Sequence, residues 1–200
     1  GADRGELFVT TKLWVQDASY ERAKQACETS LTNLGLEYLD LYLIHQPLGD
    51  IYGAWRAMEE LLDEGKVRAI GVSNLNIGRL VDLSMHNRVT PHVSQVEIHP
   101  LKDHLTQYGT VMESWFPLGG RGNTQVLFDD KTISTIAAAH GKTSAQVILR
   151  WHLQAGNIAI PGSSSEAHIQ ENFEIFDFEL TAEEMQRMQE LDRNQRFASY

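Results

Sequence analysis

Short runs of β-branched and aliphatic residues alternate along this chain with longer stretches whose apolar residues recur every three or four positions. Such alternation is typical of parallel βα units, in which each strand is followed by a helix that packs back on the sheet. Strands are predicted over residues 7–12, 39–43, 67–72, 93–97, 111–115 and 157–160. Helices are predicted over residues 20–34, 51–62, 131–140 and 143–154, and from a capping box at Thr181. The chain is therefore expected to be an α/β protein, either an open doubly wound sheet or a barrel.

Length and composition fit a single globular domain over residues 1–200. The 200 residues are 42% hydrophobic and 22% charged, which excludes a disordered chain. No run reaches the roughly 18 apolar residues of a membrane span, and the first residues do not resemble a signal peptide. A formal net charge of -10 opposes binding to nucleic acid or to an anionic membrane. The single Cys27 cannot form an internal disulfide, so it is expected to be an ordinary buried or half-buried thiol in a cytoplasmic protein.

Polar or aromatic side chains follow each predicted strand. They are Lys12, His45, Ser73, Asn74, Gln95, Trp115 and, after the last strand, residues 161–164. Taken alone, a lysine at a strand end is most often a solvated terminus, and a histidine after an aliphatic run is most often structural. In parallel β/α proteins, however, chemistry gathers at the carboxyl ends of the strands. Six strands that deliver such groups to one edge therefore predict a polar ligand site.

The segment after the last strand, IPGSSS at residues 160–165, is the most specific local signal. Free N–H groups and serine hydroxyls at the start of a helix form an anion site suited to phosphate. The simpler alternative is that Ser165 only caps the helix. The sequence has no G-x-G-x-x-G after the first strand, no Walker sequence and no metal-binding histidine pair, so neither a Rossmann sheet nor a metal site is indicated.

Five ordered motifs extend over nearly the whole chain: FVTTKLW at 8–14, LGLEYLDLYLIHQP at 34–47, GKVRAIGVSN at 65–74, QVEIHP at 95–100 and IPGSS at 160–164 with Glu171 and Asn172 behind it. In this order they resemble the motifs of the aldo-keto reductases, in particular the bacterial diketogluconate-reductase-like members. The resemblance implies a (β/α)8 TIM barrel. It also implies an oxidoreductase that reduces an aldehyde or ketone to an alcohol by hydride transfer from a nicotinamide cofactor, usually NADP(H), with NAD(H) as the alternative.

The resemblance assigns roles to individual residues. Lys12 would be the catalytic cation that tunes a proton-donating tyrosine, and the catalytic His45 would orient the substrate carbonyl beside Trp14 in the substrate pocket. The nicotinamide ring and its carboxamide would be held by Ser73, Asn74, Gln95 and Trp115. The phosphates and the adenosine would be contacted by Pro117, Leu118, Gly119, Gly162, Ser163, Ser164, His168, Glu171 and Asn172.

Three departures from the family pattern accompany the resemblance. The family's catalytic aspartate and tyrosine lie upstream of the lysine strand, and 11 residues precede Lys12. The barrel is therefore expected to lack its first two strands in this chain. The stretch after Pro100 is short for a βα connection, which predicts a second missing piece. Gly162 and His168 stand where many members carry a lysine and an arginine for the 2′-phosphate of NADPH, so those two contacts are not expected.

Two other functions remain open at this point. One is a non-catalytic nicotinamide-nucleotide-binding or regulatory subunit of the same fold, and the other is a phosphosugar-processing barrel. Quenching of tryptophan fluorescence by a nicotinamide stacked on Trp115 would argue against the phosphosugar alternative. The expected partner is a small-molecule carbonyl substrate, bound by a monomer or a weak homo-oligomer, and neither nucleic acid nor a membrane is expected as a partner.

Overall fold

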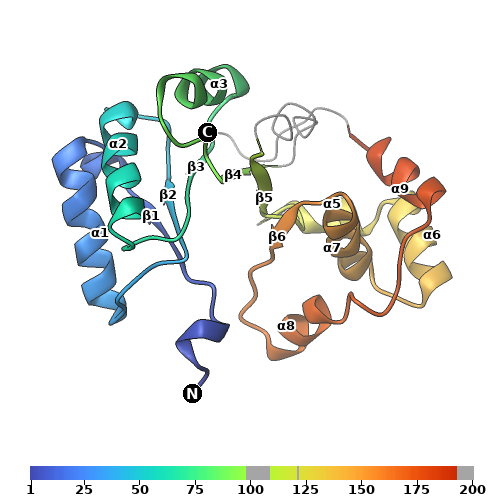
Figure 1. Ribbon diagram of the computed structural model, residues 1–200. Helices are drawn as coiled ribbons and strands as arrows, with labels where there is room; N and C mark the ends of the chain where they lie inside the picture. The colour runs from blue at the N-terminus through green and yellow to red at the C-terminus, as the bar shows by residue number, and fades with distance from the viewer. Residues whose placement is uncertain (98–108, 121, 193–200) are drawn as a thin grey trace. The chain divides into compact units, whose positions relative to one another are not determined.

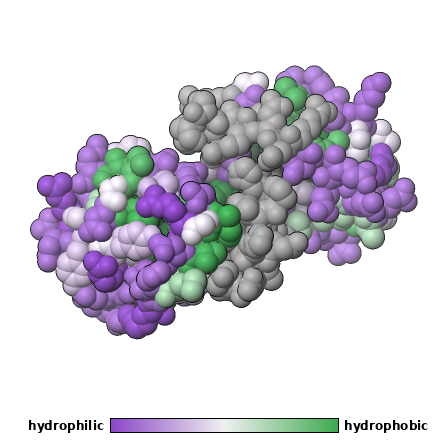
Figure 2. All heavy atoms as spheres, turned by 90° about the horizontal axis from the view of Figure 1, so that it is seen from above, coloured by the Kyte–Doolittle hydropathy of each residue, from purple (hydrophilic) through white to green (hydrophobic). Residues whose placement is uncertain are grey.

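The computed structural model describes residues 1–97, 109–120 and 122–192, which form two compact units (Figure 1). The first unit comprises Gly1–Val96 with residues 109–111, and the second comprises Glu97 with residues 112–192. The short connection predicted after Pro100 lies outside the described residues. Hydrophilic side chains cover most of the described surface that is visible in Figure 2.

The first unit is built from four parallel strands that pair in chain order. Its strands are β1 (Thr10–Leu13), β2 (Leu41–Ile44), β3 (Ile70–Ser73) and β4 (Val93–Val96), and its helices are α1 (Tyr20–Leu34), α2 (Ile51–Asp63) and α3 (Ile77–His86). The register places Lys12 opposite Leu43, and Ser73 opposite Gln95. Because neighbouring strands run in the same direction, their carboxyl ends lie along one edge of this unit.

Burial of apolar residues explains why these strands form. Every residue of β2, β3 and β4 is buried, and Leu41, Leu43 and Val93 pack into one cluster. Strands that are covered on both faces read as nearly continuous apolar runs, as these do. Trp55 and Met58 of α2 are also fully buried. Burial of a large apolar side chain stabilises the fold by about 2 kcal/mol, so this helix and the strands support each other.

The first strand begins later than the predicted range 7–12. Arg4–Glu6 forms a 3-10 turn, η1, and the following Leu7 and Phe8 are 46% and 69% exposed. Val9 N then donates to Asp40 Oδ2 at 2.8 Å. Because this backbone N–H is bound by a side chain, regular strand pairing begins only at the next residue.

Helix α3 has no counterpart among the predicted ranges, although the spacing of the strands left room for a helix. Asn76 caps it by accepting a hydrogen bond from Arg79 N at 3.0 Å. Leu80 and Leu83 are the buried residues of its ten-residue length. Two buried leucines give too short a periodic pattern to identify a helix from the sequence.

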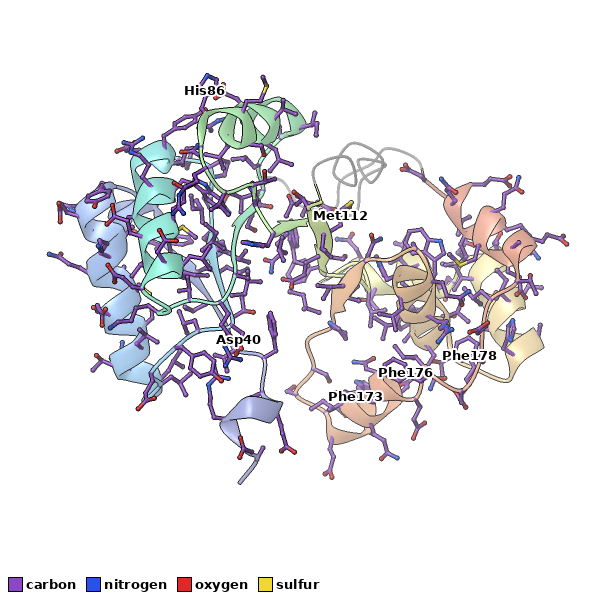
Figure 3. All side chains as sticks on the ribbon, viewed as in Figure 1. Asp40, His86, Met112, Phe173, Phe176 and Phe178 are labelled. Carbon is purple, nitrogen blue, oxygen red and sulfur yellow. The ribbon has the colours of Figure 1, made fainter. Side chains whose placement is uncertain are left out.

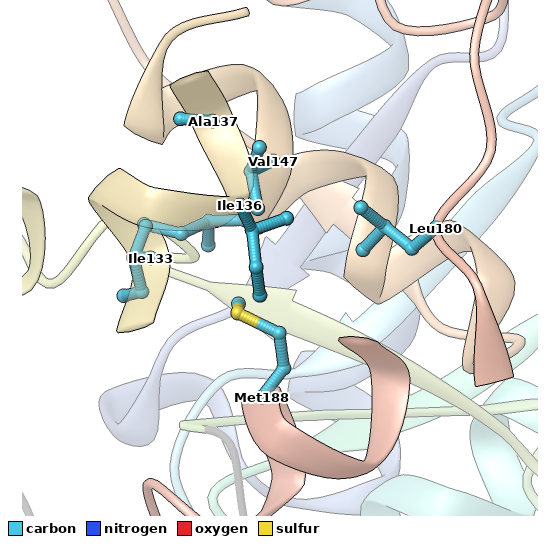
Figure 4. Close-up of a cluster of buried hydrophobic side chains, with 7 residues drawn as sticks. Ile133, Ile136, Ala137, Val147, Leu180 and Met188 are labelled. Atoms are coloured by element: carbon cyan, nitrogen blue, oxygen red, sulfur yellow. The ribbon is translucent and has the colours of Figure 1, made fainter. Parts of the chain in front are cut away.

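The second unit pairs two parallel strands and carries five helices. They are β5 (Val111–Trp115), β6 (Ile158–Ile160), α5 (Thr124–Phe128), α6 (Lys131–His140), α7 (Ser144–Gln154), α8 (Glu166–Phe173) and α9 (Ala182–Gln189). Its apolar core, shown in Figure 4, consists of Ile133, Ile136, Ala137, Val147, Ile148, Leu180 and Met188. Thr143 and Thr181 begin α7 and α9 with capping boxes. The capping box predicted at Thr181 is therefore confirmed.

Other expectations concern single features of the chain. The six predicted strands and the predicted helices all have counterparts within a few residues of the expected bounds. Cys27 is fully buried, as predicted. Within the described ranges, no helix is long and apolar enough to cross a membrane.

Candidate functional site

The carboxyl ends of β1, β3 and β4 carry three side chains that meet in the first unit. Lys12 Nζ donates to Gln95 Oε1 at 2.5 Å, and Ser73 Oγ donates to the same oxygen at 3.5 Å. Ser73 and Gln95 are each 1% exposed. An amide oxygen carries no formal charge, so this contact orients the Lys12 ammonium without cancelling its charge. The strand ends therefore hold a cationic group at a defined position.

Asn74 joins this group to the end of β2. Its backbone φ is 60°, in the left-handed region that asparagine tolerates better than most residues. Its N–H donates to the Gln95 carbonyl at 3.0 Å, and its Nδ2 lies 3.3 Å from both the His45 carbonyl and Ser73 Oγ. Non-glycine residues held in this conformation by their surroundings are concentrated at functional sites.

His45 follows β2 and lies beside Trp14, which follows β1. The centroids of the two rings are 4.9 Å apart and the rings meet at 68°. His45 N donates to the Leu13 carbonyl at 3.0 Å, so backbone pairing continues past β2. Burial, and to a lesser degree the charge of Lys12, holds the pKa of His45 below the ordinary value of 6.5. The imidazole is therefore mostly neutral at pH 7 and can donate one ring N–H.

Six residues singled out from the sequence are thus connected by direct contacts in the first unit. They are Lys12, Trp14, His45, Ser73, Asn74 and Gln95, called the lysine–histidine cluster from here on. A cation, a neutral imidazole, two amides, a hydroxyl and a partly exposed indole can bind and polarise a ligand that carries a carbonyl. In the part of the chain that the structure describes, no group of three or more His, Cys, Asp or Glu could hold a metal ion.

The segment after β5, in the second unit, contains further predicted contacts. Trp115 and Phe116 meet nearly edge-on, with ring centroids 5.1 Å apart. Phe116 has a φ of 52°, and its carbonyl accepts a hydrogen bond from Gly119 N at 2.8 Å. A Cβ on Gly120 would lie 2.4 Å from the Phe116 ring, so the turn requires glycine there. The predicted contacts Pro117, Leu118 and Gly119 all lie in this turn.

The segment from β6 into α8 holds the remaining predicted contacts. Ser165 Oγ accepts a hydrogen bond from His168 N at 3.5 Å, and Ser163 Oγ accepts one from Ser165 N at 3.0 Å. Ser165 therefore caps α8, and this geometry does not decide between a cap alone and a phosphate site, which stays a prediction. The predicted contacts on this segment are Gly162, Ser163, Ser164, His168, Glu171 and Asn172. They lie in the second unit, and the lysine–histidine cluster lies in the first.

Two residues were missed by sequence reasoning, one in each unit. Phe116 was passed over because its left-handed backbone cannot be anticipated for an aromatic residue that precedes proline. Arg79, in the first turn of α3, donates from Nη1 to the Pro47 carbonyl at 2.5 Å. No sequence motif predicts a hydrogen bond between residues 32 positions apart. The one available signal was its position on the helix that directly follows Ser73 and Asn74.

Parallel βα units with cationic, imidazole and amide side chains at their strand ends define an α/β protein with a candidate ligand site at that edge. The model of the Aldo/keto reductase family matches residues 1–113 and 120–193. The chain therefore belongs to the aldo/keto reductase family, and the resemblance seen in its motifs is confirmed. Residues 114–119, which include Trp115 and the turn after it, fall between the two matched ranges.

Several relatives share most of this chain. It is 45% identical over 203 residues to the glyoxal reductase of Bacillus subtilis, covering 98% of this chain and 72% of that protein. It is 43% identical over 210 residues to the morphine 6-dehydrogenase of Pseudomonas putida, covering 96% of this chain and 71% of that protein. A solved aldo-keto reductase of Bombyx mori, in complex with NADP, is similar with a TM-score of 0.93 at 33% identity, covering 99% of this chain and 72% of that chain.

Proposed function

We propose that this protein is an NAD(P)H-dependent oxidoreductase that reduces an aldehyde or ketone to the corresponding alcohol. The lysine–histidine cluster carries the proposal, because it joins a cation, a neutral imidazole and three hydrogen-bonding side chains from neighbouring strand ends. Relatives named glyoxal reductase and morphine 6-dehydrogenase support chemistry between a carbonyl and an alcohol.

Lys12 would act on the proton donor of the reaction. A phenol with a pKa of about 10 is a poor acid at neutral pH, and a nearby cation favours the phenolate and so makes proton release easier. The family resemblance places the donor tyrosine and an aspartate ahead of the lysine strand, and residues 1–11 contain no tyrosine.

His45 and Trp14 would position the substrate. A neutral imidazole can donate its N–H to the carbonyl oxygen, and this bond strengthens as the oxygen gains negative charge during reduction. Trp14 is 47% exposed while its ring packs against His45, so part of the indole remains available to the ligand. The pair would hold the carbonyl by one polar contact and one apolar face.

The residues of the cluster suit a nicotinamide carboxamide, which offers one acceptor and one amino group. Asn74 Nδ2 and Ser73 Oγ donate within the cluster over 3.3 to 3.5 Å, so the carboxamide would bind by replacing these long hydrogen bonds. When bound, the cofactor supplies the hydride. Trp115 would stack on the ring, and the remaining contacts proposed for the phosphates and adenosine are Pro117, Leu118, Gly119, Gly162, Ser163, Ser164, His168, Glu171 and Asn172. NADP(H) is the proposed cofactor, with NAD(H) as the alternative.

The direct test is carbonyl-dependent oxidation of NADPH by the complete gene product over a broad panel of aldehydes and ketones. Turnover is expected, and cofactor binding should quench tryptophan fluorescence through Trp115. A folded complete product that binds the nucleotide and reduces nothing would instead support a nucleotide-binding or regulatory subunit.

We further propose that residues 1–200 are one domain of a (β/α)8 barrel. Parallel strands paired in chain order support this arrangement. Scanning calorimetry of the complete gene product should give a single cooperative transition. Two separated transitions would show that the two units unfold independently and would contradict the single domain.

A further inference from the structure

The loop that carries His45 is fixed at both of its ends. At one end, Asn74 Nδ2 donates to the His45 carbonyl at 3.3 Å. At the other end, Asp50 N donates to the Ala18 carbonyl at 3.1 Å. Gly49 has a φ of 79°, and a Cβ there would lie 3.2 Å from the Ala18 Cβ, so the loop follows a narrow path. The middle of the loop needs a separate support.

Arg79 of α3 supplies that support. Its Nη1 donates to the Pro47 carbonyl at 2.5 Å. The same guanidinium lies against the Tyr52 hydroxyl: the hydrogen bond to Asp82 raises the pKa of Tyr52, and Arg79 opposes this rise. Tyr52 donates its proton to Asp82 Oδ2, which leaves the phenol oxygen free to accept from the guanidinium. Arg79 is therefore held from α2 and α3 while it holds the loop.

The Tyr52–Asp82 pair has a further contact on the outer side of α3. His86 Nδ1 lies 3.1 Å from Asp82 Oδ1, and Figure 3 shows His86 on this helix. The same Nδ1 lies 2.9 Å from the Asp82 carbonyl, so His86 contacts both the backbone and the side chain of the residue that accepts from Tyr52.

We propose that Arg79 is a positioning residue, which fixes the loop through the Pro47 carbonyl and thereby keeps His45 in place against Trp14. A guanidinium suits this task because its planar fork can donate to the carbonyl and the phenol at the same time, whereas a lysine offers a single ammonium on a more mobile stem. The effect on turnover rests on the proposed function, but the placement of His45 can be measured without any reaction.

The first test is an NMR titration of the His45 ring in the chain and in Arg79→Ala. Because the Trp14 ring lies 4.9 Å from the His45 ring, its ring current should shift the His45 resonances in the wild type. We expect these resonances to move toward values typical of exposed histidine in Arg79→Ala, and the pKa of His45 to rise toward its ordinary value. Arg79→Lys should restore part of the shift, because it can still donate to the Pro47 carbonyl.

Arg88→Ala is the matched control. Arg88 is an exposed guanidinium on the segment after α3, and its Nη2 lies 2.5 Å from Asp63 Oδ2 at the far end of α2. Its removal should leave the His45 resonances unchanged. An equal change in Arg88→Ala, or wild-type His45 resonances in a folded Arg79→Ala, would overturn the proposal.

Tyr52→Phe provides a second variant if Arg79→Ala fails to fold. It removes the phenol oxygen that supports the guanidinium and leaves the bond to Pro47 in place. We expect a smaller displacement of the His45 resonances in the same direction. A folded Tyr52→Phe with wild-type His45 resonances would show that the network does not reach the loop.

Turnover by the complete gene product tests the consequence for the reaction. Displacement of a reacting group by about 1 Å can cost roughly 100-fold in rate, so Arg79→Ala should lower kcat by roughly tenfold or more, with cofactor Kd unchanged. An unchanged kcat in an active enzyme would overturn the positioning role. A wild type without any turnover would contradict the proposed function, and the NMR result would still decide whether Arg79 positions His45.

Discussion

The two units hold their proposed ligand contacts in different ways. In the first unit, side chains from buried strand ends bond to one another, and Ser73 and Gln95 are almost completely buried. In the second unit, the contacts proposed at residues 162–164 lie in an exposed segment, where the hydrogen bonds of the Ser163 and Ser165 side chains go to nearby backbone. Groups that act on reacting atoms must be held in place before the ligand arrives. An anion can be bound by backbone N–H groups that the turn itself presents.

Replacement of Lys12 gives the largest expected effect and tests whether the first unit carries the chemistry. Lys12→Met in the complete gene product should lower kcat by roughly 100- to 10,000-fold, the range for loss of assisted proton transfer. Cofactor Kd from fluorescence quenching should change little, because the lysine is proposed to act on the proton donor. Lys66→Met is the control, since Lys66 pairs with the exposed Glu28 and should leave kcat unchanged. Loss of affinity with normal turnover would contradict this role.

Replacement of His152 tests whether the helices of the second unit form a tightly packed, rigid core. It is fully buried in α7, and burial lowers its pKa to about 4. The unfolded chain binds the proton near pH 6.5, so stability is complete above that pH and is lost as pH falls toward 4. The loss amounts to about 3 kcal/mol at 1.36 kcal/mol per pKa unit. Urea unfolding at a series of pH values should show it in the wild type and not in His152→Gln.

Parallel curves for the wild type and His152→Gln would mean that the buried imidazole is protonated in the folded state. The expectation of a rigid, dry helical core around α7 would then be wrong.

Gly71 tests how tightly the strands of the first unit are packed. A Cβ on this residue of β3 would lie 2.4 Å from the Val93 carbonyl oxygen and 2.7 Å from Leu43 Cδ2. The carbonyl belongs to the neighbouring strand and cannot rotate away, so Gly71→Ala should cost about 2 kcal/mol of unfolding free energy. Gly78→Ala in α3 is the control, because its nearest neighbour would be 3.6 Å away. The control should gain about 0.5 to 1 kcal/mol, and equal stabilities would contradict tight packing at β3.

Much of the fold could be predicted because each element has a pattern of its own. Apolar runs predicted the strands, and the capping box at Thr181 predicted where the last helix begins. The first strand was placed too early because Asp40, distant in sequence, binds the backbone of Val9. Helix α3 was not located because it buries so few apolar residues. The first error arises where a tertiary contact outweighs the local pattern, and the second where the pattern is too short to identify a helix.

The residues of the candidate site likewise divide into those that could be predicted from the sequence and those that depend on tertiary contacts. Lys12, His45 and Gln95 could be found because parallel strands bring their carboxyl ends to one edge, whatever the details of packing. Arg79 could not, because its bond to the Pro47 carbonyl depends on how α3 lies against a loop from another βα unit. The left-handed backbone of Phe116 likewise depends on a turn whose geometry the sequence does not state.

Gly162 gives the smallest expected effect and tests whether the second unit binds phosphate. A Cβ there would have nothing within 4 Å, so Gly162→Lys should fold without strain. An added ammonium facing a 2′-phosphate on an exposed turn is worth about 1 kcal/mol, which corresponds to a roughly fivefold higher preference for NADPH over NADH in kcat/KM. Gly162→Gln adds similar bulk without charge and should leave the ratio unchanged. An unchanged ratio in Gly162→Lys at low salt would show that residues 162–164 do not face that phosphate. The proposal that the second unit binds the cofactor phosphate through this segment would then be wrong.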